Sequence, residues 1–388
     1  MNLSPSKSRR QPKLPPTSPP ISLPDDLIIE VLSLLPVKSV MRLKTVCKSL
    51  NAIISNPKFI KLHQKISEQN KRILLISNDS SGSIYVGADS CLKNPLIPFA
   101  DAAYCRLKKK DKIIAIGYCN GLFCLFGYSR NTMEDWLYFW NPATKTISQK
   151  FKYSTNDSDC VIFGFGYDNS TNTYKVVTFC QMTKVARVFC LGDNSWRNIQ
   201  RFPEFCIFSS FCHSGVHLSG TLNWLVVGND VTYDWEENYI VKNFVIISLD
   251  LLRETYTQLL PPQGQCLGEG LIVEATICMF MDCLCLSYGN NEFSFVIWKM
   301  MEFGVQESWT QFLRFSYLNF PELFFGKNLV PLCLSHNGDE LILADRLEGQ
   351  LIPYNCRYHI VDPSRIAKGE WGIFVNNYVE SLVSPNGM

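Results

Sequence analysis

The sequence predicts a multidomain α plus all-β protein, with a small N-terminal domain of three helices followed by a β-propeller of about six blades. Helical hydrophobic periodicity extends from Leu23 to about Ser67. After Arg72 the pattern changes to short apolar runs separated by Gly, Asn and Asp, which is typical of strands and turns. The composition agrees, because 13% aromatic residues, 22 Gly and 20 Pro suit many short strands joined by tight turns.

The chain is expected to divide into three parts. Residues 1–21 form a disordered tail rich in Pro, Ser and basic residues, residues 22–67 form the helical domain, and residues 71–388 form the propeller. The tail has no apolar core of the length that a secretory signal requires, so we expect a cytoplasmic or nuclear protein, or both, whose 16 cysteines are thiols. The net charge of +2 does not by itself indicate nucleic acid, a membrane surface or an acidic substrate.

The first helix carries more apolar residues than its own domain can bury. Pro24 suits the first turn of this helix, and Pro36 ends it. The stripe that is expected to face the core of the domain consists of Ile28, Leu32 and Leu35. A second stripe beside it consists of Leu27, Val31 and Leu34. A segment of about 45 residues cannot enclose both stripes, so the second stripe is predicted to bind a partner.

Two further helices are predicted over residues 37–46 and 47–55, where the apolar spacing continues. Between Leu23 and Ile66 there are seven Lys or Arg residues against three Asp or Glu residues. The outward surface of the domain is therefore basic, which fits an acidic protein partner.

The remaining chain repeats a unit of two parts. The first part is a strand pair led by glycine or proline, as in GYCNGLFCLFG, GFGYDNSTNTYKVVTF, GVHLSGTLNWLVV and PLCLSHNGDELILA. The second part is a strand, a turn and a further strand, as in YFWNPATKTISQ and RVFCLGDNSWRNIQ. Gly117, Gly164 and Gly215 are 47 and 51 residues apart, which is the length of one four-stranded blade with its loops.

Radial stacking is the arrangement that buries both apolar faces of such small sheets and leaves only short edges exposed. A propeller is therefore predicted. The last segment, GIFVNNYVESLVSP, alternates like a strand and is far from any other unit in the sequence. We expect it to pair with the first strand, near RILLIS, and to close the ring.

Several motifs resemble, in order, those of one plant family. The stretch LPDDLIIEVLSLLPVKSVMRLKTVCKSL, which begins at Leu23, resembles an F-box. The units FWNPATK, GFGYDNSTNTYKVV, GVHLSGTLNWL, IWKMMEFGVQESW and YVESLVSP resemble the F-box-associated, kelch-like domain of plant F-box proteins. The resemblance covers nearly the whole chain after the tail.

This resemblance implies a substrate receptor without catalytic activity of its own. The helical domain would dock on a Skp-type adaptor, and through it on the cullin scaffold, of an SCF (Skp, cullin, F-box) ubiquitin ligase. The kelch-like propeller would bind an unknown protein client for ubiquitination and degradation. The positions implied to contact the adaptor are Leu23, Pro24, Leu27, Ile28, Val31, Leu32, Leu35, Pro36, Val37, Leu43, Val46 and Cys47.

One position departs from the family pattern. Family members usually have Trp after the Cys-Lys-Ser sequence, where this chain has Leu50. Leucine keeps the position apolar but offers less contact area, so adaptor binding is expected to be weaker by about 1 kcal/mol.

The sequence carries no recognised catalytic or metal-binding pattern. The five histidines are scattered over different units, and there is no Gly-x-Ser-x-Gly elbow and no pair of Cys-x-x-Cys elements. The glycines of GFGYDNSTNTY precede a hairpin and not a helix, so they do not form a nucleotide cradle. We therefore expect no catalytic residue, no metal site, no cofactor and no membrane span.

The candidate client-binding residues are Tyr233, Trp235 and Tyr239, because Trp and Tyr among acidic residues are typical of protein contact sites. Trp136 is a further candidate for an exposed aromatic at the rim. The segment YDNSTNTYK is predicted to be a hairpin loop in which Asp168 bonds the backbone of its own turn, and alternatively forms part of a client-binding mouth.

Two other functions remain open. The basic helical domain would suit a nuclear or nucleic-acid-associated regulator outside the ligase, although nucleic acid does not explain the second apolar stripe. The β domain would suit a glycan-binding or enzymatic propeller, although no acid, base or nucleophile constellation supports catalysis.

Overall fold

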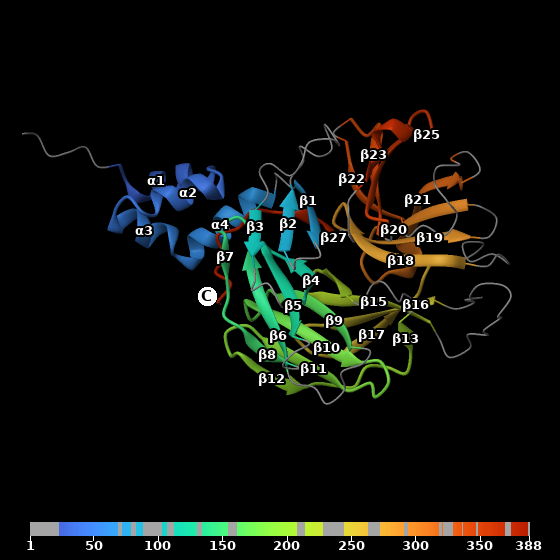
Figure 1. Cartoon of the computed structure of the whole chain (residues 1–388), viewed down its shortest axis with the longest axis horizontal. Helices are drawn as coiled ribbons and strands as arrows, with labels where there is room; N and C mark the ends of the chain where they lie inside the picture. Colours follow the sequence, from blue (N-terminus) through green and yellow to red (C-terminus); the bar gives the residue numbers. More distant parts are fainter. Residues whose placement is uncertain are drawn as a thin grey trace, which may run out of the picture.

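The computed structural model places a helical domain beside a ring of small β-sheets (Figure 1). It describes residues 23–68, 72–78, 83–87, 103–106, 112–129, 134–153, 161–207, 214–227, 244–262, 272–290, 294–317, 320, 329–335, 337–346, 348–368 and 374–386. Within these ranges no helix is long and apolar enough to cross a membrane.

The helical domain, residues 23–68, contains four helices where the sequence predicts three. They are α1 (Asp25–Ser33), α2 (Val37–Leu43), α3 (Lys48–Ile54) and α4 (Pro57–Ser67). The helix that the prediction omits is α4. It begins where the Asn56 side chain accepts a hydrogen bond from the Lys58 N–H and Pro57 occupies the first turn, both of which favour a helix start.

The β domain consists of six groups of four or five strands within the described residues, which we number as blades in order around the ring. Blade 1 contains β27 (Phe374–Tyr378), β1 (Arg72–Asn78), β2 (Ser83–Gly87) and β3 (Ala103–Arg106). Blade 2 contains β4 (Lys112–Cys119), β5 (Leu122–Ser129), β6 (Glu134–Asn141), β7 (Thr146–Ile147) and β8 (Phe151–Tyr153). Blade 3 contains β9 (Val161–Asp168), β10 (Thr173–Cys180), β11 (Ala186–Cys190) and β12 (Ser195–Asn198).

The other half of the ring has the same plan. Blade 4 contains β13 (Cys206–Ile207), β14 (Ser214–Leu218), β15 (Thr221–Val227), β16 (Phe244–Asp250) and β17 (Tyr256–Leu259). Blade 5 contains β18 (Ile272–Phe280), β19 (Cys283–Asn290), β20 (Ser294–Met300) and β21 (Trp309–Ser316). Blade 6 contains β22 (Leu329–Leu334), β23 (Glu340–Asp345), β24 (Gln350–Asn355), β25 (Ile360–Val361) and β26 (Ala367–Lys368). The blade number expected from the repeat spacing is thereby confirmed.

The two ends of the β domain meet in blade 1. The last strand, β27, pairs antiparallel with the first strand, β1, with Arg72 opposite Tyr378 and Ile76 opposite Phe374. Figure 1 shows β27, from the end of the chain, beside β1. The pairing of the last segment with RILLIS is confirmed, and it closes the ring by hydrogen bonds between strands at opposite ends of the β domain's sequence.

Glycines on the inner strands let neighbouring blades approach closely. A Cβ atom on Gly117 of β4 would lie 2.6 Å from Phe165 of β9, and one on Gly164 of β9 would lie 2.7 Å from Trp224 of β15. Trp224 is buried between blades 3 and 4, and its indole N–H donates to the Phe163 carbonyl at 3.0 Å. The glycine-led repeat therefore has a packing cause, because any side chain there would hold adjacent blades apart.

Candidate protein-interaction site

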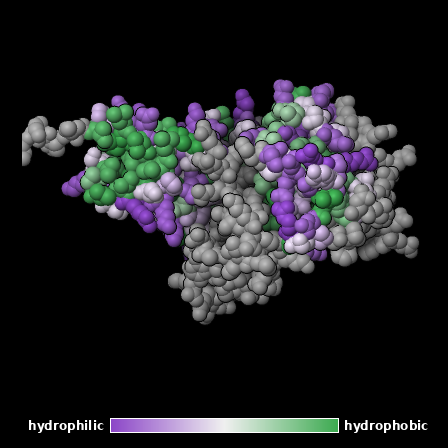
Figure 2. All heavy atoms as spheres, turned by 90° about the horizontal axis from the view of Figure 1, so that it is seen from above, coloured by the Kyte–Doolittle hydropathy of each residue, from purple (hydrophilic) through white to green (hydrophobic). Residues whose placement is uncertain are grey.

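The first helix exposes one apolar stripe and buries the other. Leu27, Val31 and Leu34 are 48%, 60% and 69% exposed. By contrast, Leu32 is 4% exposed and lies in the core of the helical domain, against which Ile28 and Leu35 pack. This confirms the division predicted from the sequence. Figure 2 shows hydrophobic residues gathered over the helical domain, bordered by hydrophilic ones.

The twelve positions implied to contact an adaptor fall into three groups. The exposed ones are Leu23, Pro24, Leu27, Val31, Pro36, Val46 and Cys47. The partly buried ones are Ile28, Leu35 and Leu43. Leu32 and Val37 are buried, at 4% and 0% exposure, so they have little surface to offer a partner and instead support the exposed stripe from below. Leu34, which follows the last residue of α1, is the most exposed large apolar residue of the helical domain and completes the surface.

The other helices of the domain carry exposed cations. Lys38, Arg42 and Lys48 are exposed on α2 and α3, and Lys58 and Lys61 are exposed on α4. An exposed apolar stripe on a domain with more surface cations than anions suits a protein partner that is apolar at the contact and acidic overall, because apolar contact provides affinity and charge favours encounter.

Two family models match the chain. The model of the F-box associated beta propeller domain matches residues 65–385, and the model of the F-box domain matches residues 21–62. The chain belongs to the F-box-associated β-propeller family. The helical domain is its F-box domain, as the motifs of the first helices indicate.

The relatives of this F-box protein include proteins of Arabidopsis thaliana. It is 28% identical to the F-box/kelch-repeat protein At3g23880 over 393 residues, which cover 95% of this chain and 97% of that protein. It is 27% identical to the putative F-box/kelch-repeat protein At3g17280, over 62% of this chain and 60% of that protein. It is 23% identical to the F-box protein CPR1, over 84% of this chain and 82% of that protein.

Two positions near the start of α3 have roles inside the F-box domain. The Cys47 sulfur accepts a weak hydrogen bond from the Leu50 N–H at 3.5 Å, so this exposed residue caps α3. Leu50 is partly buried and packs against the core of the domain. The leucine that replaces the usual Trp therefore contributes to the packing of the F-box itself, in addition to any contact with an adaptor.

The candidate client-binding residues Tyr233, Trp235 and Tyr239 lie outside the described residues. The strands on either side of them are β15 and β16, whose ends Val227 and Phe244 are paired. The prediction that Trp136 is exposed is wrong, since it is 4% exposed. Its indole lies against Gly127, where a Cβ would be 2.4 Å from the ring nitrogen, so the missing side chain of the neighbouring strand makes room for the ring.

The hairpin loop between β9 and β10 is held by its own side chains, as predicted. Asp168 accepts hydrogen bonds from the N–H groups of Ser170 and Thr171 at 2.9 and 3.3 Å. Burial raises the pKa of Asp168, but these bonds and those from the Thr171 hydroxyl and Lys175 outweigh it, so the pKa is lowered overall. The side chain of Asn172 accepts a hydrogen bond from Lys61 of α4. This loop therefore contacts the F-box domain, which argues against the alternative of a client-binding mouth at this position.

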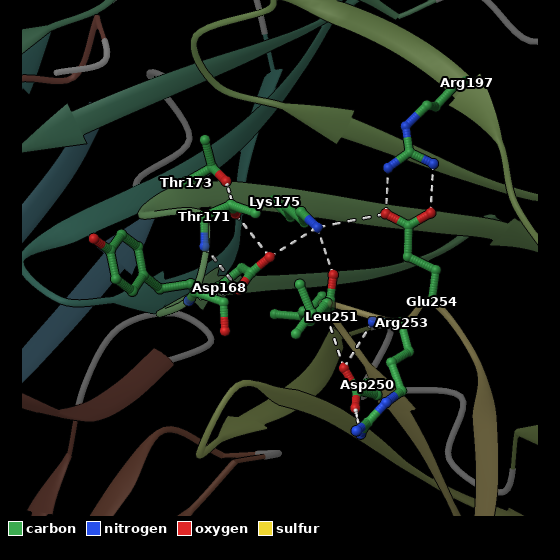
Figure 3. Close-up of polar contacts among 12 residues, drawn as sticks. Asp168, Thr171, Thr173, Lys175, Arg197, Asp250, Leu251, Arg253 and Glu254 are labelled. Carbon is green, nitrogen blue, oxygen red and sulfur yellow. Dashed lines mark hydrogen bonds and ion pairs between the residues drawn. The ribbon is translucent and has the colours of Figure 1, made fainter.

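A buried group of charges joins blades 3 and 4 (Figure 3). Lys175 on β10 lies 3.1 Å from Asp168 and 3.4 Å from Glu254, which belongs to the turn between β16 and β17. Glu254 also binds Arg197 of β12 with both carboxylate oxygens. The side chains of Lys175 and Asp168 are 6% and 2% exposed, and each charge has opposite charges beside it. The arrangement is structural, because its charged groups are paired with one another.

A second polar cluster lies where blades 2, 3 and 4 meet. His217 on β14 lies 3.4 Å from the Cys119 sulfur, and its Nε2 accepts a hydrogen bond from the Tyr167 N–H at 3.3 Å. Burial lowers the pKa of His217 to about 4 and raises the pKa of the Cys119 thiol. Both groups are therefore neutral near pH 7. A neutral thiol is a poor nucleophile, so the pair lacks the ionisation that a catalytic cysteine needs.

Proposed function

We propose that this protein is the substrate-recognition subunit of an SCF-type ubiquitin ligase. The F-box domain docks on a Skp-type adaptor and through it on the cullin scaffold, and the propeller binds a protein client. The observation that carries the proposal is the exposed stripe Leu27, Val31 and Leu34 in a domain that belongs to the F-box family. The protein contributes proximity, and the ubiquitin-charged enzyme of the complex contributes the chemistry.

The physical reason is the free energy available from the stripe. Fully burying a leucine or valine side chain contributes about 1.5 to 3 kcal/mol, and these three side chains are roughly half exposed or more. Their burial against an adaptor would offset part of the entropy that association costs. Nucleic acid would not bury them, so the apolar surface favours the ligase role over a nucleic-acid role.

The test is titration calorimetry of the full chain against a purified plant Skp-type adaptor. Leu27→Asp places a carboxylate in the centre of the contact and is expected to weaken binding by about 100-fold or more. Leu252→Asp is the matched control, because Leu252 is 50% exposed on blade 4 and Leu27 is 48% exposed. Equal affinities of the Leu27→Asp variant and the control, or no binding by the folded unaltered chain, would refute the proposal.

We further propose that the client binds the side of the propeller that faces away from the F-box domain. The F-box domain contacts the turn between the first two strands of blade 3, through Lys61 and Asn172. Residues 228–243 join β15 to β16, the β14–β15 turn of blade 4 corresponds to the β9–β10 turn of blade 3, and consecutive connections of an antiparallel blade alternate between its two faces. This supports Tyr233, Trp235 and Tyr239 as contacts with a client in the cytoplasm or nucleus.

Proximity labelling in plant cells tests the client assignment. Proteins that are labelled by the unaltered chain, and that accumulate when the ligase is inhibited, are candidate clients. The triple variant Tyr233→Ala, Trp235→Ala and Tyr239→Ala is expected to lose these proteins while it still binds the adaptor. Unchanged labelling of the same proteins by the variant would refute the role of these three residues.

A further inference from the structure

The residues that follow β27 pass between the F-box domain and the propeller. We call residues 379–383 the C-terminal clasp. The Tyr118 hydroxyl accepts a hydrogen bond from the Val379 N–H at 2.8 Å and donates one to the Val379 carbonyl at 3.1 Å. The Asn141 side chain donates to the carbonyls of Ser381 and Val383 at 2.8 and 2.9 Å. The partly buried Tyr118 and the buried Asn141, both of blade 2, thus hold the clasp backbone at three positions.

The clasp fits against blade 2 without space to spare. Gly121, in the turn between β4 and β5, has a φ of +86°, and a Cβ atom there would lie 2.1 Å from the Ser381 Cβ. Ser381 is 0% exposed, and its hydroxyl accepts a hydrogen bond from the Val383 N–H at 3.1 Å. The path of the clasp is therefore fixed by the backbone of the propeller.

Consecutive side chains of the clasp enter two different cores. Leu382 is 8% exposed and belongs to the core of the F-box domain, with Val37, Val40 and Phe59. Val383 is 1% exposed and belongs to the core between blades 2 and 3. Glu380 accepts a hydrogen bond from the Val37 N–H at 3.2 Å, at the start of α2, where Pro36 supplies no capping side chain. The clasp thereby fastens α2 to blade 2.

A second attachment lies at α4. Ile60 packs against both the F-box core and the core of blades 2 and 3, and the Lys61 ammonium donates to Asn172 of the β9–β10 turn. The chain itself crosses from the F-box domain to the propeller once, between Glu68 and Arg72. A single covalent crossing does not fix the rotation of one domain relative to another, whereas additional contacts at separate points do.

We propose that the C-terminal clasp fixes the orientation of the F-box domain on the propeller, with Glu380 and Leu382 as positioning residues for ubiquitin transfer. This inference rests on the proposed ligase function for its consequence, but the clasp can be tested without it. Because ubiquitin transfer depends on proximity, a fixed orientation restricts which lysines the charged enzyme reaches. β27 thus closes the ring, and the clasp that follows it sets the geometry of the receptor.

The direct test is a distance measurement between two spin labels in the full chain. Labels attached to noncanonical amino acids at the exposed positions Glu30 and Asp193 avoid the native cysteines. The unaltered chain is expected to give one narrow distance distribution. In the double variant Glu380→Ala and Leu382→Ala the distribution is expected to become at least about twice as wide, as domains without a fixed interface move relative to each other.

The control is Glu204→Ala with Leu252→Ala, which makes the same two changes at exposed positions of the propeller. It is expected to leave the distribution narrow. If the double clasp variant fails to fold, as judged by loss of α-helical circular dichroism, the single variant Glu380→Ala is measured instead, because it removes the hydrogen bond to Val37 and keeps the packing of Leu382. An unchanged narrow distribution in a folded clasp variant would overturn the proposal.

The functional consequence is measured in the reconstituted ligase by mapping the lysines of this chain that become ubiquitinated. The clasp variant is expected to bind the adaptor as tightly as the unaltered chain but to be modified at lysines that the unaltered chain spares. An unchanged set of modified lysines would overturn the positioning role. If the unaltered chain does not bind the adaptor, the ligase function is refuted. The distance measurement still tests the clasp in that case.

Discussion

The F-box domain and the propeller differ in the side chains that they expose and bury. Six of the fourteen large hydrophobic side chains that are exposed among the described residues lie in the short F-box domain. In the propeller, buried polar side chains such as Lys175, Asp168 and Asn141 are joined to partners within the same chain. The F-box domain thus leaves an apolar surface exposed at α1, whereas these buried polar groups of the propeller find their partners within it.

The difference shows which surfaces carry information about function. Exposed apolar residues at helical spacing indicate a missing partner, because a monomer rarely leaves such a patch in water. A buried charge network indicates stability and correct assembly, because its groups are unavailable to a ligand. Three changes in stability test this comparison, and they add to the binding and distance measurements proposed above.

The largest effect is expected for Lys175→Met. The substitution leaves Asp168 and Glu254 beside each other without the central cation, and breaking a buried ion pair in this way costs about 3 to 5 kcal/mol. Urea unfolding followed by tryptophan fluorescence measures the loss. Lys152→Met is the matched control, because Lys152 and Glu134 are 3.9 Å apart with side chains 73% and 55% exposed, and such pairs contribute at most about 1 kcal/mol. Similar losses in both variants would show that the buried network is not special.

The second effect depends on pH. The pKa of His217 is about 4 in the folded chain because burial disfavours the imidazolium, against about 6.5 in an unfolded chain. Between these values the unfolded state binds the proton and the folded state does not, so stability falls as the pH falls from 6.5 to 4. The full difference corresponds to about 3 kcal/mol and is absent above pH 6.5.

Urea unfolding of the unaltered chain and of His217→Gln at pH 7, 6, 5 and 4.5 isolates this contribution. Other acidic groups titrate in the same range, so the informative quantity is the difference between the two pH profiles. The variant is expected to have the shallower profile. Parallel profiles, or an imidazole pKa near 6.5 by NMR in the folded chain, would show that His217 is not buried in the neutral form.

The sequence predicts a structural feature where the physical cause of that feature is local or is repeated along the chain. The spacing of Leu27 and Val31 at one helical turn predicts a common face, and the exposure of both follows from the small size of the domain. The recurring glycines predict blades because each blade has to pack closely against its neighbour. The pairing of β27 with β1 was predictable because one strand remained after the repeats were counted.

Other features depend on contacts between distant parts of the chain. Nothing in the local sequence indicates that Leu382 enters the F-box core while Val383 enters the propeller core. Lys175 and Glu254 are 79 residues apart, and either would pass for an exposed charge. Trp136 is buried because Gly127 on the paired strand makes room for it, which requires the strand register. Such features require the three-dimensional arrangement.

The smallest effect is expected at Leu34, and it gives the sharpest form of the comparison. Leu34→Ala removes a side chain that is 69% exposed, so the free energy of unfolding is expected to change by less than about 0.5 kcal/mol. Leu32→Ala, two residues away, empties a site that is 4% exposed and is expected to cost about 2 to 5 kcal/mol. Thermal unfolding measures the loss of stability in both variants, and titration calorimetry with the adaptor measures the effect of each variant on binding. If Leu34→Ala weakens adaptor binding without any loss of stability, the contact with the adaptor, and not the fold, requires this leucine. A comparable destabilisation by both variants would mean that the exposed stripe belongs to the fold.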